Sequence, residues 1–333
     1  HGKRTAWREA AGQAWTPKPP LELPIERRSA TVKLSAPAKI NLFLRILAQE
    51  RSGYHQLETL FCRVQFGDEL EIEKTPEGIS LDVEGAEIGP PEENLAYRAA
   101  EGFLKVAGVR EGVRILLRKR VPLGAGLGGG SSDAASTLLG LANLFPESLG
   151  SEDLLRIAGT LGSDVPFFLS SSPLALAWGR GDRIHPLPPL PSLPLLLALP
   201  PLEVSTPWAY GRLAQRRGEE SSPPGPRLLS PESLESWEGV SGLVENDFEE
   251  VVFGEHAYLK RLGMALQEGG PLLSLLSGSG SALFGVFPDV DGAGAARARL
   301  QEEFPETKFV LTRTEGRARD PRTFEGVEIK VGL

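Results

Sequence analysis

The chain has 333 residues, of which 41% are hydrophobic and 24% charged, a composition typical of a globular protein with room for two domains. Its formal net charge of -8 argues against nucleic acid as the main partner, and no apolar run reaches the roughly 18 residues that a membrane-spanning helix needs. One cysteine cannot form an internal disulfide, and four histidines make a zinc site improbable. These totals indicate a cytoplasmic protein with neither a membrane nor a nucleic-acid partner.

Residues 1–30 are proline-rich and show no sustained hydrophobic period. They lack the long apolar stretch of a secretory signal, so we expect a disordered extension. Ordered structure should begin with a strand over Thr31–Ile46, because apolar residues alternate with polar ones along Leu34–Leu44. This alternation places Lys39 and Asn41 side by side on the second face of the strand.

The rest of the first half reads as an irregular mixture of strands and helices. A turn at Arg51–Tyr54 should lead into a strand over Gln56–Phe66, and Gly67-Asp68 is predicted to be the next turn. The elements expected after it are strands at Glu69–Lys74 and Ile79–Val83, a helix at Asn94–Val106, a strand at Gly112–Arg118, a helix from its N-cap Ser151 to Leu161, a short element after Asp164, and a strand at Ala175–Trp178. Strands and helices without regular alternation indicate an α+β domain.

A proline-rich segment, His185–Pro207, marks a change of domain around the apolar run Leu195–Leu199. We therefore expect domains at residues 31–184 and 185–333. Gln215–Glu238 is rich in Ser, Pro, Glu and Arg and is predicted to be a long surface excursion. The elements expected beyond it are helices at Asn246–Phe253, Glu255–Leu266 and Gly292–Glu303, and strands at Leu272–Leu276, Ala282–Phe287 and Lys308–Thr314.

The most informative stretch is Val121–Ser136, VPLGAGLGGGSSDAAS, which is followed by leucines at helical spacing in Thr137–Phe145. A glycine loop that leads into a helix N-terminus presents free N–H groups and the positive end of the helix dipole to an anion. Phosphate is the first candidate for that anion. A tight glycine turn that merely caps an ordinary helix is the structural alternative.

Two familiar phosphate motifs do not fit this loop. It contains G-x-G-x-x-G, but Pro122 interrupts the junction between strand and loop. A dinucleotide site also needs an acidic residue at the end of a second strand about 20 residues later, where this chain is still leaving a helix. A Walker loop requires Gly-Lys followed by Ser or Thr, and no Gly-Lys pair occurs after Lys3.

Three segments together resemble the GHMP kinases, the family of galactose, homoserine, mevalonate and phosphomevalonate kinases. They are Ala36–Leu44 (APAKINLFL), the loop P-x-x-x-G-L-G-G-G-S-S-D-A-A that begins at Pro122, and Leu276–Ala282 (LSGSGSA). The resemblance implies a two-domain α+β fold, with a ribosomal protein S5 domain 2-like N-terminal domain and a ferredoxin-like α+β C-terminal domain. It also implies ATP and Mg²⁺ as cofactors, with the site between the domains.

Within this family, the segments APAKINLFL, RSGYHQLETLF, GLGGGSSDAA and TLGSDVPFF closely resemble one branch. Its members phosphorylate the 2-hydroxyl of 4-diphosphocytidyl-2-C-methyl-D-erythritol in the non-mevalonate route to isoprenoids. The resemblance implies this small molecule as substrate, with a monomer or homodimer as the working form. One alternative is another kinase of the family, such as homoserine or phosphomevalonate kinase, which Gly53-Tyr-His55 and the triple glycine disfavour. The other is a nucleotide-binding relative without catalysis, which the retention of Lys39 and Asp164 disfavours.

The resemblance also implies a role for each matching residue. Lys39 and Asp164 are the expected catalytic pair, although an aspartate at a helix start and a strand lysine are ordinary features by themselves. The residues expected to bind ATP are Pro122, Gly124, Gly126, Leu127, Gly128, Gly129, Gly130, Ser131 and Ser132 of the loop, with Asn94 and Lys119 near adenine and ribose. Ser132 is the candidate Mg²⁺ ligand. The residues expected to bind the acceptor are Asn41, Tyr54, His55, Tyr210, Gly278, Ser279 and Gly280, of which Tyr54, His55 and Tyr210 would surround the cytosine.

Overall fold

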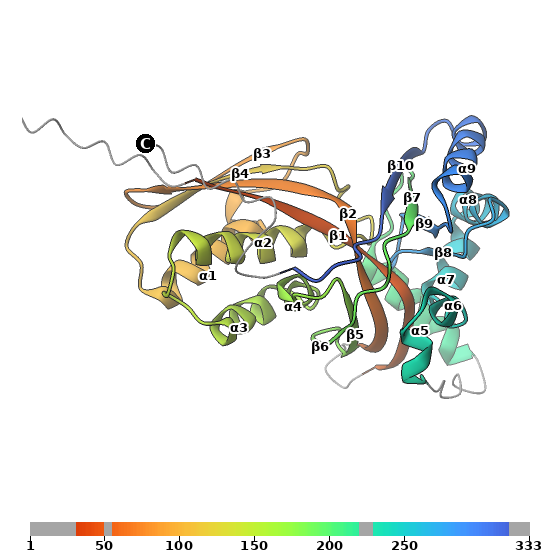
Figure 1. Ribbon diagram of the computed structural model, residues 1–333, viewed down its shortest axis with the longest axis horizontal. Helices are drawn as coiled ribbons and strands as arrows, with labels where there is room; N and C mark the ends of the chain where they lie inside the picture. The colour runs from red at the N-terminus through yellow and green to blue at the C-terminus, as the bar shows by residue number, and fades with distance from the viewer. Residues whose placement is uncertain (1–30, 50–54, 220–228, 320–333) are drawn as a thin grey trace, which may run out of the picture.

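A computed structural model describes residues 31–49, 55–219 and 229–319. The expected disordered extension, residue Tyr54 and the end of the C-terminal tail lie outside these ranges. The described part has two halves, each with a sheet covered by helices on one side (Figure 1). Two long strands run from the first half into the second, so the halves share part of their framework.

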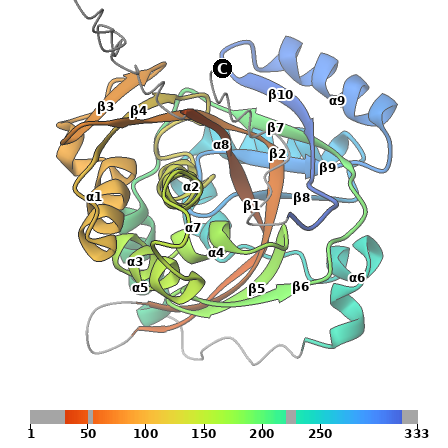
Figure 2. The same ribbon diagram turned by 60° about the vertical axis from the view of Figure 1, so that its left-hand side comes forward.

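The first sheet has six described strands in the order β3-β4-β2-β5-β6, with β1 antiparallel to β2. Its strands are β1 (Thr31–Gln49), β2 (His55–Thr75), β3 (Ile79–Glu84), β4 (Gly112–Arg118), β5 (Leu174–Gly179) and β6 (Arg183–Leu187). One face is covered by α1 (Leu95–Ala107), α2 (Gly129–Leu144), α3 (Ser151–Leu161) and α4 (Val165–Leu169), after the short turn η1 (Pro91–Glu93). Figure 2 looks almost along α2, which lies in the middle of this layer.

The alternation predicted for the first strand is confirmed. Successive apolar residues of β1 belong to three different hydrophobic cores. Val32, Leu34 and Ala36 pack between the first sheet and its helices. Further along, Ala38, Ile40 and Leu42 pack between the two sheets. The last pair, Leu44 and Ile46, packs with the helices of the second half. Because one strand contributes to every core, the two halves are held at a fixed spacing along β1.

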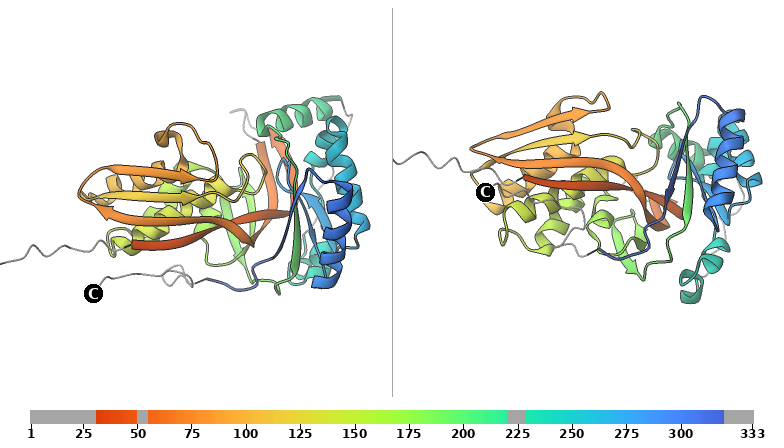
Figure 3. Two further views of the ribbon diagram at one scale, coloured as in Figure 1. Left: turned by 90° about the horizontal axis from the view of Figure 1, so that it is seen from above. Right: turned by 45° about the horizontal axis from the view of Figure 1, so that its top comes forward.

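The second sheet is antiparallel, with the order β10-β7-β9-β8. Its strands are β7 (Pro194–Leu199), β8 (Leu273–Leu276), β9 (Leu283–Val286) and β10 (Lys308–Arg313), and this order is that of the expected ferredoxin-like domain. The helices of this half are α5 (Thr206–Glu219), α6 (Trp237–Ser241), α7 (Phe248–Glu255), α8 (Ala257–Glu268) and α9 (Val290–Glu303), with the turn η2 (Pro231–Leu234). Figure 3 shows α9 on the outer side of this sheet, away from the first half.

The turn predicted at Gly67-Asp68 is wrong, because β2 continues through both residues without interruption. Gly67 is required by a close approach of two strands: a Cβ at this position would lie 2.2 Å from the carbonyl oxygen of Ala36. Asp68 is completely buried and accepts backbone hydrogen bonds from Arg120 and Val121. A Gly-Asp pair is typical of turns, and here tertiary contacts override that local preference.

Two helix starts also differ from the prediction. The N-cap of α3 is Gly150, and Ser151 is the first helical residue. Helix α2 begins at Gly129, inside the glycine run and well before the leucines that predicted it. Glycine and serine are poor helix formers, so this early start depends on the burial of α2 among its neighbours.

The surface excursion predicted at Gln215–Glu238 is wrong at both of its described ends. Helix α5 extends to Glu219, and Trp237 is only 8% exposed, with its Nε1 donating to the carbonyl of Pro191 at 2.7 Å. The Ser/Pro/Glu-rich composition of this segment gave no indication that Trp237 would be buried. The domain boundary after residue 184 stays a prediction, but β6 crosses that position and pairs with β5 of the first sheet.

Among the helices of the described ranges, none is both long and apolar enough to cross a bilayer.

Arg63 of β2 joins three distant segments although its side chain is only 1% exposed. Its Nε donates to Glu315 at 3.1 Å, and its two terminal nitrogens donate to the carbonyls of Ser170 at 2.6 Å and Ser171 at 3.0 Å. Ser170 and Ser171 follow α4, and Glu315 follows β10. A buried ion pair of this kind is costly to break on one side, because the remaining charge stays buried without a partner.

We therefore expect Arg63→Met to lower the free energy of unfolding by about 3–5 kcal/mol. Urea denaturation followed by circular dichroism measures this change. Arg114→Met is the matched control, because Arg114 forms an ion pair with Asp82 on an exposed surface and its loss should leave stability almost unchanged. Equal effects of the two substitutions would contradict the role of Arg63 in joining the segments.

Candidate active site

The glycine loop between β4 and α2 has a backbone that most residues cannot adopt. Gly124, Gly126 and Gly128 have φ angles of 64°, 77° and 70°, in the left-handed region that favours glycine. Gly128 is the N-cap of α2, and the first backbone N–H groups of the helix have no intrahelical acceptor. The loop therefore presents backbone donors and the positive end of a buried helix to an anion, as predicted.

Lys39 of β1 lies directly beneath this loop. Its Nζ donates to the carbonyl of Gly126 at 2.9 Å and to Oδ1 of Asn41 at 2.8 Å, and it lies 3.7 Å from Oδ2 of Asp164. Burial lowers the pKa of the Lys39 ammonium, while the nearby Asp164 carboxylate opposes that shift. A Cβ at Gly128 would lie 3.1 Å from Cγ of Lys39, so a glycine there leaves room for the lysine chain.

Asp164 precedes α4 but does not cap it with its side chain. Its side chain is 32% exposed, so one edge of the carboxylate is open to solvent while the other faces Lys39. The sequence left open whether this aspartate is only a helix cap. Because no side-chain capping bond is formed, the carboxylate is available to a ligand.

The second glycine segment, Leu276–Ala282, comes from near the other end of the chain and packs against the phosphate loop. A Cβ at Gly126 would lie 1.9 Å from the carbonyl oxygen of Ser277, so the two backbones touch. Ser277 Oγ donates to the carbonyl of Gly126 at 3.0 Å, and Gly278 N–H donates to Oδ1 of Asn41 at 3.0 Å. Ser279 Oγ lies 2.8 Å from the hydroxyl of Thr206. Of the expected site residues 278–280, Gly278 thus contacts Asn41 and Ser279 contacts Thr206.

His55 and Tyr210 also meet, although they are far apart in the sequence. Their rings stack with centroids 4.6 Å apart and planes inclined by 25°. Burial, and then the Asp164 carboxylate, raises the pKa of Tyr210 to about 12. Partial burial and the Arg217 guanidinium lower the pKa of His55, so its imidazole is neutral at pH 7. The two rings are in direct contact, so a base in this conformation would stack on an outer face and not between them.

Two expected ATP contacts have protein partners instead. The Nζ of Lys119 donates to Asp68 at 2.5 Å and Asp133 at 2.7 Å. Oδ1 of Asn94 accepts the N–H of Ala96 and caps α1. Contacts from Asn94 and Lys119 to a nucleotide stay predictions.

Ser132 is the expected metal ligand, and its environment suits that role. Its Oγ is buried in the first turn of α2 and has no hydrogen-bond partner. In the described part of the chain, no three His, Cys, Asp or Glu side chains cluster closely enough to hold a metal alone. Mg²⁺ commonly takes only one or two protein ligands and completes its shell with water and substrate phosphates.

Several residues that support the site were missed by the sequence interpretation. The side-chain amide of Asn246 donates to the carbonyls of Leu276 and Gly278, each at 2.8 Å, and so holds the second glycine segment. Thr59 accepts from Asn41 Nδ2 at 2.8 Å and fixes that amide. Neither residue carries a local signal, because each is polar at a position that becomes buried only in the folded chain.

Comparison with known proteins agrees with this geometry. The GHMP kinase N-terminal domain family matches residues 94–172. The 4-diphosphocytidyl-2-C-methyl-D-erythritol kinase of Geobacter sp. strain M21 is 40% identical over 274 residues, which is 81% of this chain and 95% of that protein. The chain belongs to the GHMP kinases, in the family of 4-diphosphocytidyl-2-C-methyl-D-erythritol kinases.

Solved structures give the same assignment. A crystal structure of 4-(cytidine 5'-diphospho)-2C-methyl-D-erythritol kinase superposes with a TM-score of 0.71 at 38% identity, covering 85% of this chain and 99% of that one. Homoserine kinase from Cytophaga hutchinsonii has a TM-score of 0.65 at 16% identity, covering 87% of this chain and 96% of that one. The second likeness concerns the fold alone.

The contact between the two glycine segments can be tested with a matched pair of substitutions. Gly126→Ala and Gly124→Ala both place a Cβ on left-handed backbone, which costs about 1–2 kcal/mol. Only at Gly126 does the Cβ collide with the opposite backbone, since at Gly124 its nearest neighbour is 3.9 Å away. We expect Gly126→Ala to reduce ATP affinity much more than Gly124→Ala, as measured by titration calorimetry. Similar affinities for the two variants would mean that the contact is not needed for the site.

Proposed function

We propose that this chain transfers the γ-phosphoryl group of ATP to the 2-hydroxyl of 4-diphosphocytidyl-2-C-methyl-D-erythritol. The products are the 2-phosphate and ADP, and the reaction is a step of isoprenoid precursor synthesis by the non-mevalonate pathway. The observation that carries the proposal is the position of Lys39 and Asp164, 3.7 Å apart beneath the glycine loop. The identity to kinases of this name over most of their length supports the choice of substrate.

In the proposed reaction, the carboxylate of Asp164 accepts the proton of the 2-hydroxyl as the oxygen attacks the γ-phosphorus of ATP. Such a base must reach the hydroxyl directly, and the open edge of Asp164 allows this approach. The ammonium of Lys39, 3.7 Å from this carboxylate, would offset the negative charge that develops on the transferred phosphoryl group. Burial lowers the pKa of the Lys39 ammonium, and the negative phosphates of bound ATP would oppose this shift and favour the charged form. Because Lys39 also binds the carbonyl of Gly126, it fixes the base relative to the phosphate loop.

The loop from Pro122 to Ser132 would hold the ATP phosphates with its backbone N–H groups. Mg²⁺ would be bound through Ser132 Oγ together with phosphate oxygens, and it supplies charge neutralisation on the transferred group. Asn41 and residues 278–280 would position the acceptor beside Asp164. Asn94 is proposed to lie near the adenine.

The cytosine would stack against the pair formed by His55 and Tyr210. In its neutral form the His55 imidazole can donate or accept a hydrogen bond at the edge of the base. Tyr54 directly precedes His55 and is proposed to stack on the base, but it lies outside the described residues. A cytoplasmic location and a monomeric or homodimeric state are proposed with the function.

The substrate assignment is best tested with a panel of acceptors. The purified chain is mixed with MgATP and one of 4-diphosphocytidyl-2-C-methyl-D-erythritol, homoserine, phosphomevalonate or galactose, and ADP release is measured by a coupled assay. We expect turnover with the cytidylyl compound only. Preferential turnover of homoserine or phosphomevalonate would replace the assignment with another kinase of the family, and ATP binding without any turnover would favour a non-catalytic relative.

The role of the base can be tested by Asp164→Asn, which keeps the size of the side chain and removes the proton acceptor. We expect kcat to fall roughly 100- to 10,000-fold. The affinity for ATP should remain close to that of the unsubstituted chain, as measured by titration calorimetry. Turnover within a few-fold of normal would remove Asp164 from the role of base.

The cytosine site can be tested by Tyr210→Ala with Tyr210→Phe as its control. Loss of a stacking partner costs about 1–3 kcal/mol per base, so KM for the cytidylyl substrate should rise roughly tenfold or more in the alanine variant. The phenylalanine variant keeps the ring and should stay close to normal. An unchanged KM in the alanine variant would show that the base stacks elsewhere.

A further inference from the structure

Lys119 lies in a buried cluster of three charged side chains that the proposed reaction does not use. It follows the last residue of β4, where the glycine loop begins. Its Nζ lies 2.5 Å from Asp68 of β2 and 2.7 Å from Asp133 of α2, and all three side chains are at most 4% exposed. The ammonium thus joins one acid from the sheet below the loop to one acid from the helix after it.

Asp68 also holds the backbone where the loop leaves the sheet. Its Oδ1 accepts the N–H groups of Arg120 at 2.5 Å and Val121 at 2.8 Å, while its Oδ2 binds Lys119. One carboxylate therefore fixes both the side chain of Lys119 and the direction of the two residues after it. Because amide N–H groups and an ammonium are all donors, both oxygens of Asp68 act as acceptors at this position.

The C-terminal end of the loop, where α2 begins, is bound by the same Lys119 ammonium. Asp133 lies in the second turn of α2, and its Oδ2 binds Lys119. Gly129, the first residue of α2, leaves room for this contact, since a Cβ there would lie 3.3 Å from Lys119 Nζ and 3.0 Å from Val121 Cγ1. The strand end and the helix start are thus brought together across a single ammonium group.

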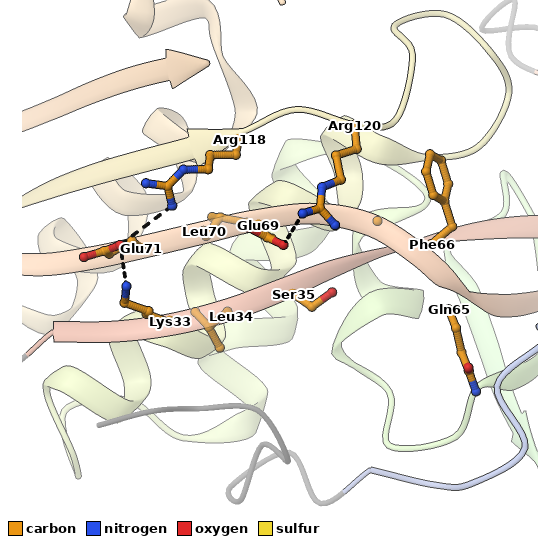
Figure 4. Close-up of a pocket in the computed structure, with 11 residues that line it drawn as sticks. Lys33, Leu34, Ser35, Gln65, Phe66, Glu69, Leu70, Glu71, Arg118 and Arg120 are labelled. Carbon is orange, nitrogen blue, oxygen red and sulfur yellow. Dashed lines mark ion pairs between the residues drawn. The ribbon is translucent and has the colours of Figure 1, made fainter. Parts of the chain in front are cut away.

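The neighbouring cations point away from the cluster. Figure 4 shows Arg118 and Arg120 in a groove on the outer face of the first sheet, beside Glu69 and Glu71. Arg120 pairs with Glu69 at 2.6 Å, and Arg118 lies 3.8 Å from Glu71. Of the three consecutive basic residues 118–120, only Lys119 points inward, where its ammonium forms ion pairs with Asp68 and Asp133.

A cluster of this kind is a poor source of stability. Asp133 is buried, with a side chain that is only 3% exposed. Its Oδ1 has no hydrogen-bond partner. Buried ion pairs are often no more stabilising than apolar residues of similar volume, and their best-attested use is to specify one geometry.

We propose that Asp68, Lys119 and Asp133 form a positioning cluster, which fixes the two ends of the phosphate loop relative to each other, and that Lys119 affects ATP through the loop and not by contact. The cluster sets the distance between the end of β4 and the first turn of α2. The loop between them must present its N–H groups to the phosphates in one arrangement. This inference rests on the proposed role of the loop as the ATP site.

The two possible roles of Lys119 predict opposite effects when a neighbouring acid is neutralised. If Lys119 binds ATP directly, Asp68→Asn or Asp133→Asn frees its ammonium and removes a negative charge, so ATP affinity should stay the same or rise. If the cluster positions the loop, each substitution places an NH₂ group against the ammonium or the backbone donors. ATP affinity should then fall, although the site has lost negative charge.

The experiment compares ATP binding by the full chain and by its Asp68→Asn, Asp133→Asn and Lys119→Met variants, using titration calorimetry with MgATP. We expect all three to bind ATP roughly 10- to 100-fold more weakly, since a small displacement of binding groups can cost up to about 100-fold. In a steady-state assay, KM for the acceptor should stay nearly unchanged. Lys33→Met is the matched control, because Lys33 pairs with Glu71 in the outer groove. It should bind ATP normally.

Two results would overturn the proposal. One is normal or improved ATP affinity in the aspartate variants together with a loss in Lys119→Met, which indicates direct contact. The other is a lowered melting temperature in all three variants with normal ATP affinity below that temperature, which indicates a structural role only. If Asp68→Asn does not fold, Asp133→Asn decides, because it leaves the two backbone hydrogen bonds accepted by Asp68 intact. Failure of the unsubstituted chain to bind ATP would instead refute the proposed function.

Discussion

The ammonium group of Lys39 is the contact on which the rest of the site depends. It reaches the carbonyl of Gly126 in the phosphate loop, the amide oxygen of Asn41 on its own strand, and the carboxylate of Asp164. Each partner comes from a different element, so one buried charge sets the position of the loop, the strand and the helix start together. Burial disfavours this charge and lowers the pKa of Lys39, and the Asp164 carboxylate opposes that shift only in part.

The second constraint is that two glycine segments touch backbone to backbone. Gly126 comes shortly after β4 and Ser277 shortly after β8, yet no side chain fits between them. Asn41 bridges the contact, because its side-chain oxygen accepts from both Lys39 and Gly278. The site is therefore complete only when both halves of the chain are folded. Arg63 adds to this linkage by joining β2 to the segments after α4 and β10.

Buried charge recurs throughout the framework of the site. Lys39, Arg63 and Lys119 all have side chains at most 5% exposed, and each is paired with a carboxylate. Such pairs contribute little net stability, but they tolerate only one arrangement of their partners. In this chain they lie where the strands, helices and loops around the phosphate site meet.

The sequence by itself determined the elements whose signals are local. Alternation along β1 placed Lys39 and Asn41 on one face, and the glycine run marked a phosphate loop at a helix start. The ordered motifs also pointed to the family and to an α+β fold with a ferredoxin-like second half. Each of these depends on spacing within a short segment, which the backbone geometry translates directly into position.

Only the tertiary structure decided which distant residues meet. Gly67 and Asp68 resemble a turn in sequence, but pairing with the neighbouring strand β1 and two backbone donors keep them within β2. Lys119 has no sequence signal for its two partners, Asp68 and Asp133, which come from β2 and α2. Asn246 and Thr59 have no local signal at all, because their importance comes from burial beside segments far away in the chain. Contacts of this kind depend on how the sheets and helices pack, which the spacing of residues along the chain does not specify.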